Sequence, residues 1–212
     1  MASVRTEDFG LSSSSKPLPD GKLSEAEFLA WCDEGGQAEW VDGQVIVAAP
    51  PTSGESDLMA FLLCLLSLYV EDRNLGEVFG APLTARLSPR CRRVPDVMFV
   101  ANERLPSLQP THLEGPPDLA IEIVSRDSVE RDWREKFYDY QAAGVHEYWI
   151  VDPAHQRLEA HQLVDGKYRR VEHEQGRIAS AAINGFHLRE EWLWRTELPR
   201  VRDALEEIET AG

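Results

Sequence analysis

Residues 118–153 constrain the fold most, because the spacing of their apolar side chains changes twice within 36 positions. Residues 119–124 are almost wholly apolar, as in a strand covered on both faces. A helical spacing follows over residues 129–140, and residues 148–151 are again apolar. This order predicts a β-strand, an α-helix and a second, parallel β-strand, joined by a right-handed crossover.

The predicted helix has an apolar face and a clear end. Trp133, Phe137 and Tyr140 follow one another at i, i+4 and i+7. Gly144 stands where a helix C-terminus favours a left-handed residue. At about 100° per residue, Lys136 lies roughly 60° from Trp133, on the flank of the apolar face. We therefore expect its ammonium group to reach past that face towards the sheet.

Two acidic residues occur in otherwise apolar strands. Glu122 interrupts the first strand near its middle, where an unpaired carboxylate would be costly. Asp96 follows Pro95 at the start of another apolar run, residues 97–100. Carboxylate oxygens suit a magnesium-like ion, and a nearby ammonium group such as that of Lys136 can orient water or stabilise charge on a phosphate. The three residues together predict a metal site.

Each of these residues also has a simpler interpretation. Glu122 can be a buried acid paired with an arginine or a backbone donor, and Asp96 can be a turn or cap acid after proline. Lys136 can be a surface partner of Asp132, which stands four residues earlier.

The rest of the chain predicts further elements around this unit. Ser24 and Glu27 form a capping-box pattern at the start of a first helix, which we expect to end near residues 35–36. Asp42 and Gly43 favour the type I′ turn of a hairpin. The other predicted elements are a helix over residues 55–71, strands over 78–87 and 94–100, a loop over 102–117, a solvent-facing hairpin over 157–173 and an acidic helix over 198–208.

Length and charge limit the possible organisation and partners. The 212 residues predict a flexible polar leader, residues 1–21, and a single domain, residues 22–212. A net charge of −15 argues against tight nonspecific DNA binding through broad phosphate contacts. A local basic patch remains compatible with it, and the candidate is the run that contains Arg86, Arg90, Arg92 and Arg93.

Cysteine spacing and hydropathy indicate a cytoplasmic protein. Cys32, Cys64 and Cys91 are far apart and odd in number, so they suggest neither a disulfide framework nor a CxxC metal site. The longest apolar run, residues 58–70, is shorter than the roughly 20 residues that span a bilayer. We expect it to be a buried helix, with no membrane association.

Several segments together resemble a known family. The sequences EWVDGQ, PDVMFV, EIVS, DWREKFYDY and AGVHEYWIVDP are similar to motifs of the Uma family of restriction endonucleases, within the PD-(D/E)xK nuclease superfamily. The resemblance covers roughly residues 23–185. It implies an α/β (mixed α+β) restriction-endonuclease-like core with a mixed central sheet flanked by helices. It also implies Mg²⁺ or Mn²⁺ and hydrolysis of DNA phosphodiester bonds.

By position, the resemblance implies specific roles. Asp96 and Glu122 would be the metal-binding acids, Glu39 a supporting acid, and Lys136 the catalytic lysine moved from the strand to the helix. Val124 stands where other members of the superfamily keep that lysine. The chain departs from the family at one place, because Glu55 occupies a position where many members carry histidine.

Two functions of different classes follow. One is a metal-dependent DNA endonuclease, expected to act as a homodimer because nucleases that cut both strands commonly work as twofold dimers and the family resemblance implies the same. Trp192 and Trp194 are candidate interface residues, although burial within one chain explains them equally well. The alternative is a catalytically inactive nuclease-fold module that serves protein association.

Overall fold

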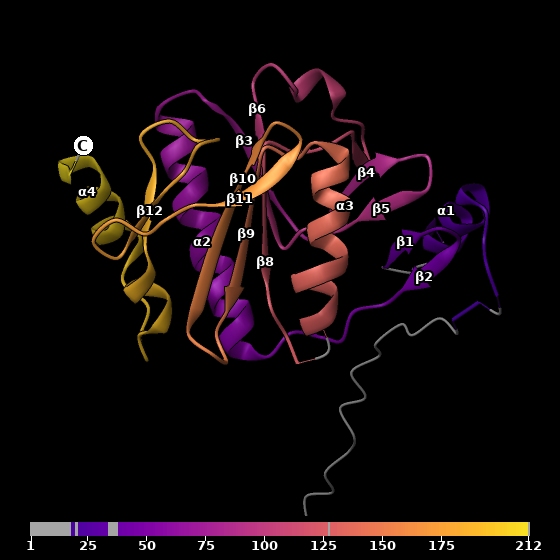
Figure 1. Cartoon of the computed structure of the whole chain (residues 1–212), viewed down its shortest axis with the longest axis horizontal. Helices are drawn as coiled ribbons and strands as arrows, with labels where there is room; N and C mark the ends of the chain where they lie inside the picture. The colour runs from indigo at the N-terminus through magenta and orange to yellow at the C-terminus, as the bar shows by residue number, and fades with distance from the viewer. Residues whose placement is uncertain (1–17, 20, 34–37, 127, 212) are drawn as a thin grey trace, which may run out of the picture.

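A six-stranded mixed sheet forms the centre of the chain in the computed structural model, which describes residues 18–19, 21–33, 38–126 and 128–211 (Figure 1). The strand order is β11-β10-β9-β8-β6-β3, in which β8 and β9 are parallel and the other neighbours antiparallel. The strands are β3 (Gly76–Gly80), β6 (Val97–Ala101), β8 (Leu119–Ile123), β9 (Glu147–Asp152), β10 (Arg157–Val164) and β11 (Lys167–Arg170). This confirms the parallel strand pair that the sequence predicted.

Helices cover both faces of this sheet (Figure 1). The long helix α2 (Ser53–Asp72) and the terminal helix α4 (Val201–Ala211) contact each other on one side, and α3 (Lys136–Ala143) lies on the other. Among the described helices, α2 alone has the length and apolarity to cross a membrane. One face of this helix packs in the core against the sheet, and Leu62, Leu65 and Leu66 on that face are fully buried.

A second sheet lies beside α3 and supplies part of the candidate site. Its strand order is β2-β1-β5-β4-β7, and its bounds are β1 (Glu39–Val41), β2 (Gln44–Ile46), β4 (Thr84–Ser88), β5 (Cys91–Arg93) and β7 (His112–Glu114). Helix α1 (Glu25–Asp33) packs on β1 through Phe28, Trp31 and Trp40. Only residues 94–96 separate β5 from β6, so the chain passes there from one sheet directly to the other.

The remaining elements are short. They are the 3₁₀ turns η1 (Leu105–Ser107) and η3 (Glu190–Trp194), the π-helical turn η2 (Arg131–Glu135), and the strands β12 (Arg177–Ala179) and β13 (His187–Arg189). The pair β12–β13 and η3 cover the same face of the central sheet as α2, with Ile178, Leu188 and Trp192 in the core.

Three local predictions are confirmed. Ser24 Oγ accepts a hydrogen bond from the Glu27 N–H, and the Glu27 carboxylate accepts one from the Ser24 N–H, as in a capping box. Asp42 and Gly43 both have positive φ, 50° and 92°, which a type I′ turn requires. Gly144 ends α3 in the left-handed region. The predicted end of the first helix, near residues 35–36, and most of the predicted leader lie outside the described residues.

Other boundaries were wrong. The strand predicted over residues 78–87 is two strands, β3 and β4, which belong to different sheets and flank the Ala81–Pro82 peptide bond. The loop predicted over residues 102–117 contains η1 and β7. The hairpin over residues 157–173 exists, but it is not solvent-facing, because Leu158, Glu159, Ala160 and His161 are buried. These boundaries depend on strand pairing between residues that are distant in the sequence, which leaves little signal in the local spacing of apolar residues.

Candidate active site

The ammonium group of Lys136 lies among three carboxylates. Its Nζ atom is 2.7 Å from Glu122 Oε2, 3.0 Å from Glu39 Oε1 and 3.6 Å from Asp132 Oδ1. Lys136 is only 4% exposed, so it is not the surface partner of Asp132 that one interpretation predicted. The i,i+4 pair exists, but it is part of a buried cluster.

Glu122 is held by two donors from the same helix. Its strand, β8, alternates its side chains between the two faces, and Glu122 points to the face that α3 covers. The Tyr140 hydroxyl donates to Glu122 Oε1 at 2.6 Å, while Lys136 engages Oε2. The partners are therefore a lysine and a tyrosine rather than the arginine or backbone donor of the simpler interpretation.

Asp96 lies beside Glu122, at the start of the neighbouring strand. It immediately precedes β6, and its Oδ2 atom accepts a hydrogen bond from the Ile123 N–H at 2.7 Å. Strands β6 and β8 pair in a register that sets Val97 opposite Ile121. Asp96 therefore hydrogen-bonds to the residue that directly follows Glu122.

Arg93 positions Glu39 against the cluster. Its Nη1 atom is 2.7 Å from Glu39 Oε2, and its Nη2 atom is 2.7 Å from Asp139 Oδ2 on α3. The Val94 N–H also donates to Glu39 Oε1, at 3.2 Å. Because Arg93 ends β5, this guanidinium group ties the second sheet to the helix that carries Lys136.

Burial and charge shift the titration of these groups. Burial raises the pKa of Glu122 well above its usual range, and repulsion from Asp96 opposes the lowering effect of Lys136. Burial also raises the pKa of Asp96 and of Asp132. For Glu39, burial acts in the same direction, but Lys136 and Arg93 outweigh it and its pKa is lowered. For Lys136, the acids outweigh burial and raise its pKa.

The sequence interpretation missed the polar face of the helix. The buried side chains are Asp132, Lys136 and Tyr140, whereas Trp133 and Phe137 are half-buried against β10 and β11. The i, i+4, i+8 spacing of an acid, a lysine and a tyrosine was visible in the sequence. The buried face of a helix is expected to be apolar, so this polar spacing was not interpreted as the buried face.

The donor chemistry of the cluster fits a divalent cation. Asp96, Glu122 and Asp132 supply hard oxygen atoms, and burial disfavours leaving them charged without a cation beside them. In the part of the chain that the structure describes, no group of three or more acidic, histidine or cysteine side chains is placed so that it could hold a metal ion. Lys136 supplies the positive charge among these acids.

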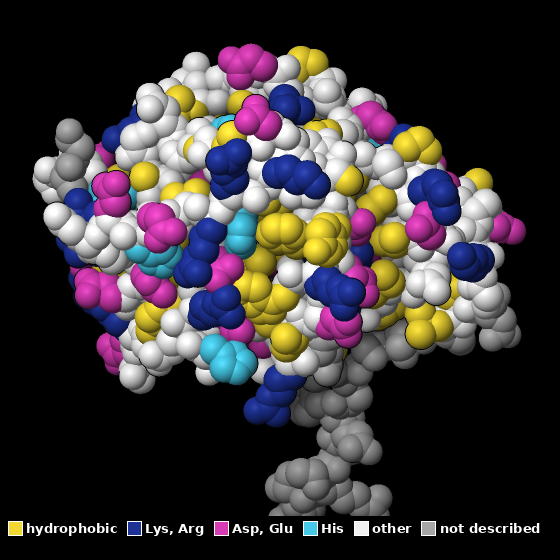
Figure 2. All heavy atoms as spheres, viewed as in Figure 1, with side chains coloured by type: hydrophobic (Ala, Val, Ile, Leu, Met, Phe, Trp, Pro, Cys, Tyr) yellow, Lys and Arg dark blue, Asp and Glu magenta, His cyan; other side chains and the backbone are white. Residues whose placement is uncertain are grey.

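The arginine run before Asp96 is not a free basic patch. Arg86 and Arg92 both pair with Glu25, and Arg90 pairs with Asp42. The fourth member, Arg93, is buried in the cluster described above. Figure 2 shows the face over α3 and β10, where basic and acidic side chains alternate around a hydrophobic area.

Two further features lie outside the cluster. Glu55, the departure from the family pattern, is the third helical residue of α2, and its carboxylate accepts from the Thr52 N–H in a capping box.

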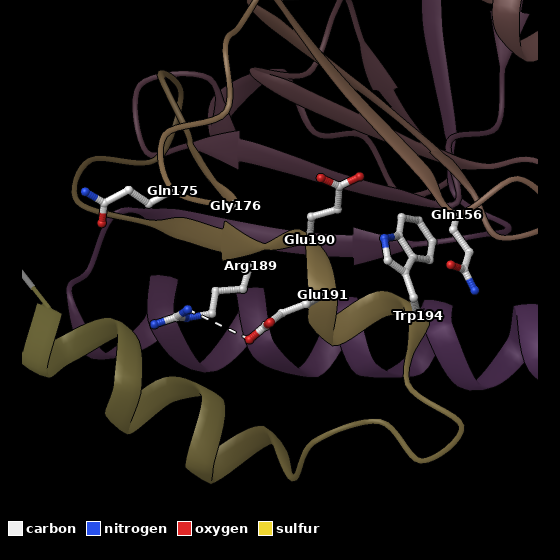
Figure 3. Close-up of a pocket in the computed structure, with 7 residues that line it drawn as sticks. All are labelled: Gln156, Gln175, Gly176, Arg189, Glu190, Glu191 and Trp194. Carbon is white, nitrogen blue, oxygen red and sulfur yellow. Dashed lines mark ion pairs between the residues drawn. The ribbon is translucent and has the colours of Figure 1, made fainter.

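A hollow of about 360 Å³ lies between β12–β13, η3 and the loop after β9, and Arg189, Glu190 and Trp194 line part of it (Figure 3). None of the predicted site residues lines that hollow.

Comparison with known proteins agrees with this architecture. The crystal structure described as "a putative nuclease belonging to DUF820 from Anabaena variabilis ATCC 29413" superposes with a TM-score of 0.68 at 17% identity, over 81% of this chain and 97% of that one. The mixed sheet with helices on both faces is thus a restriction-endonuclease-like fold. No curated protein matches the sequence significantly.

A family model then places the chain more closely. The model described as "Uma2: Putative restriction endonuclease" matches residues 25–191. The chain belongs to this Uma2 family, which confirms the resemblance found in the sequence.

Proposed function

We propose that this protein is a metal-dependent DNA endonuclease that hydrolyses phosphodiester bonds at the cluster of Glu39, Asp96, Glu122 and Lys136. The observation that carries the proposal is their convergence from separate elements: Lys136 contacts Glu39 and Glu122, and Asp96 hydrogen-bonds beside Glu122. Residues separated by up to 97 positions meet at one place, and the family is described as one of restriction endonucleases.

The roles follow from the contacts. Asp96 and Glu122 would hold Mg²⁺ or Mn²⁺, which would supply Lewis-acid stabilisation of the phosphate and an activated water. Lys136 carries a flexible stem, so its ammonium group can exchange Glu122 for an oxygen of the scissile phosphate. Glu39 keeps a second contact to Lys136 during that exchange, and Arg93 fixes Glu39 from the other side.

The alternative is a nuclease fold used for protein association. It is favoured by the internal pairing of the acids with Lys136, Tyr140 and Arg93, and by the net charge of −15. Such a cluster can stabilise the fold without any catalytic role. The two functions differ in whether removing one acid abolishes DNA cleavage while leaving the fold intact.

Cleavage of plasmid DNA in Mg²⁺ tests the proposal with two matched variants. Asp96→Asn keeps the shape of the side chain and an oxygen that can accept from the Ile123 N–H, but removes the charge. Asp118→Asn makes the same change at the other end of the β6–β8 pair, where Asp118 accepts from the Ala101 N–H. We expect Asp96→Asn to lose at least about a hundredfold in rate, on the scale of losing one electrostatic stabiliser. The Asp118→Asn control should cut at the parental rate.

Absence of metal-dependent cleavage in the parent, or equal rates in the parent and Asp96→Asn, would reject the endonuclease proposal and favour the association module. EDTA should abolish cleavage by the parent. A double-stranded substrate is needed, because a nicked product and a linear product report one-strand and two-strand cutting separately.

We also infer that a homodimer performs double-strand cleavage, since each chain supplies one cluster. Trp192 is 2% exposed and packs in the core of its own chain, so its burial needs no second copy. Trp194 packs against the same core and is partly buried. Light scattering at micromolar concentration tests the dimer, and a monomer at that concentration refutes it.

A further inference from the structure

The helix that carries Lys136 begins with a π-helical turn. The Lys136 N–H donates to the carbonyl of Arg131, five residues earlier, instead of to Asp132 as α-helical geometry requires. The carbonyl of Asp132 therefore does not accept the Lys136 N–H that it would accept in an α-helix. The hydroxyl of Tyr148 on β9 donates to it at 2.8 Å, and Tyr148 is fully buried.

This turn changes which side chains face the site. In a regular α-helix, four residues overshoot one turn by about 40°, so residues 132 and 140 would diverge by about 80°. A π turn takes more than four residues, so four residues there fall short of a full turn. The overshoot of the α-helical turn and the shortfall of the π turn therefore partly cancel. Asp132, Lys136 and Tyr140 consequently all lie buried on the face towards Glu122.

The side chain of Asp132 has a free oxygen in this buried cluster. Asp132 is 2% exposed, and within the described part of the chain its Oδ1 atom has no hydrogen-bond partner. The nearest cationic atoms are Lys136 Nζ at 3.6 Å and Arg131 Nε at 4.0 Å, both beyond hydrogen-bonding distance. A buried carboxylate oxygen without a donor is costly and unusual in a native fold.

We propose that Asp132 is a further carboxylate ligand of the cation-binding site, presented to it by the π turn that Tyr148 stabilises. The inference rests on the proposed metal-dependent function. It adds a residue that neither the sequence interpretation nor the superfamily motif places among the metal ligands. The competing explanation is that Asp132 only balances the charge of Lys136, in which case cation affinity does not depend on it.

Calorimetric titration with Mn²⁺ separates the two explanations. Asp132→Asn keeps the volume of the side chain but replaces the carboxylate, while Lys136 retains Glu39 and Glu122. The matched control is Glu130→Gln, which removes one negative charge two residues away, from a side chain that is 79% exposed and contacts Arg134. We expect Asp132→Asn to weaken Mn²⁺ binding at least about tenfold, and Glu130→Gln to change it less than twofold.

Tyr148→Phe provides an independent variant, because it removes only the donor to the Asp132 carbonyl. We expect circular dichroism to report a folded protein and Mn²⁺ affinity to fall at least about tenfold, since the Asp132 carboxylate is no longer held towards the site. The same fall in Mn²⁺ affinity should occur at high ionic strength, where long-range charge effects are screened.

Parental Mn²⁺ affinity in Asp132→Asn or in Tyr148→Phe overturns this inference, provided that Glu122→Gln weakens binding in the same experiment. Absence of Mn²⁺ binding by the parent overturns the proposed function itself, and this inference with it. If Asp132→Asn does not fold, the result with Tyr148→Phe decides alone.

Discussion

Replacing Lys136 with methionine should destabilise the protein strongly and in a pH-dependent way. The substitution keeps an unbranched apolar stem but deletes the charge that lies between Glu122 and Glu39. Glu122 is 1% exposed and Glu39 is 7% exposed, so water cannot replace the ammonium group. Removing one partner of a buried ion pair costs about 3–5 kcal/mol. That is a large part of a typical unfolding free energy of about 5–15 kcal/mol.

The sign of the pH dependence follows from the carboxylates. Burial already raises the pKa of Glu122, and loss of Lys136 removes the nearest charge that lowers it. An acid whose pKa is higher in the folded than in the unfolded protein binds more protons when folded, so stability falls as pH rises. The deficit of Lys136→Met should therefore be greatest near pH 8 and should shrink as pH falls towards 5.

Urea unfolding at pH 8 and pH 5.5, in EDTA, measures this effect. The double variant Lys136→Met/Glu122→Gln replaces the carboxylate that has lost its cation with a neutral amide and should be about 1–3 kcal/mol more stable than Lys136→Met at pH 8. A loss below about 1 kcal/mol in Lys136→Met, or an equal loss at both pH values, would refute the buried charge cluster. The proposed role of Lys136 at the phosphate also predicts a loss of cleavage in this variant, which must be measured below its unfolding transition.

Two further predictions concern side chains around the cluster and at the first helix. Tyr140→Phe removes the donor to Glu122 Oε1 and should lower the unfolding free energy by about 1.5–3 kcal/mol, measured in urea; an unchanged midpoint contradicts the contact. Arg86 and Arg92 lower the pKa of Glu25 to about 2, so its contribution to stability is present above pH 4.5 and lost as pH falls towards 2. Glu25→Gln should therefore flatten acid unfolding over that range, and an unchanged acid profile would be inconsistent with this pairing.

Local patterns in the sequence were sufficient for the elements that local chemistry determines. The capping box at Ser24, the turn at Asp42 and Gly43, and the helix end at Gly144 all depend on neighbouring residues, and all were found. Glu147 lies on β9, and its contacts reach beyond its neighbours in the sequence. Its carboxylate accepts from Trp149 Nε1, from Ser180 Oγ and from two backbone N–H groups of the following turn.

The features that depend on distant contacts were not predictable in the same way. The π turn requires the Tyr148 hydroxyl from β9, which lies 16 residues after the carbonyl that it stabilises. The burial of Arg93 requires acids from β1 and α3, and spacing alone made it look like part of a basic patch. The candidate acids and Lys136 were identifiable because charged residues in apolar strands and family motifs both mark them.

We propose that Asp96 and Glu122 hold a divalent cation, and thermal unfolding with and without Mg²⁺ measures this binding through its effect on stability. At about a hundred times the dissociation constant, binding adds about 2.7 kcal/mol of stability. For a chain of this size, about 2–4 °C per kcal/mol gives an expected rise in Tm of about 5–11 °C. We expect this rise in the parent and in Asp118→Asn, and no rise in Asp96→Asn. A rise of the same size in Asp96→Asn, or no rise in the parent, would contradict it.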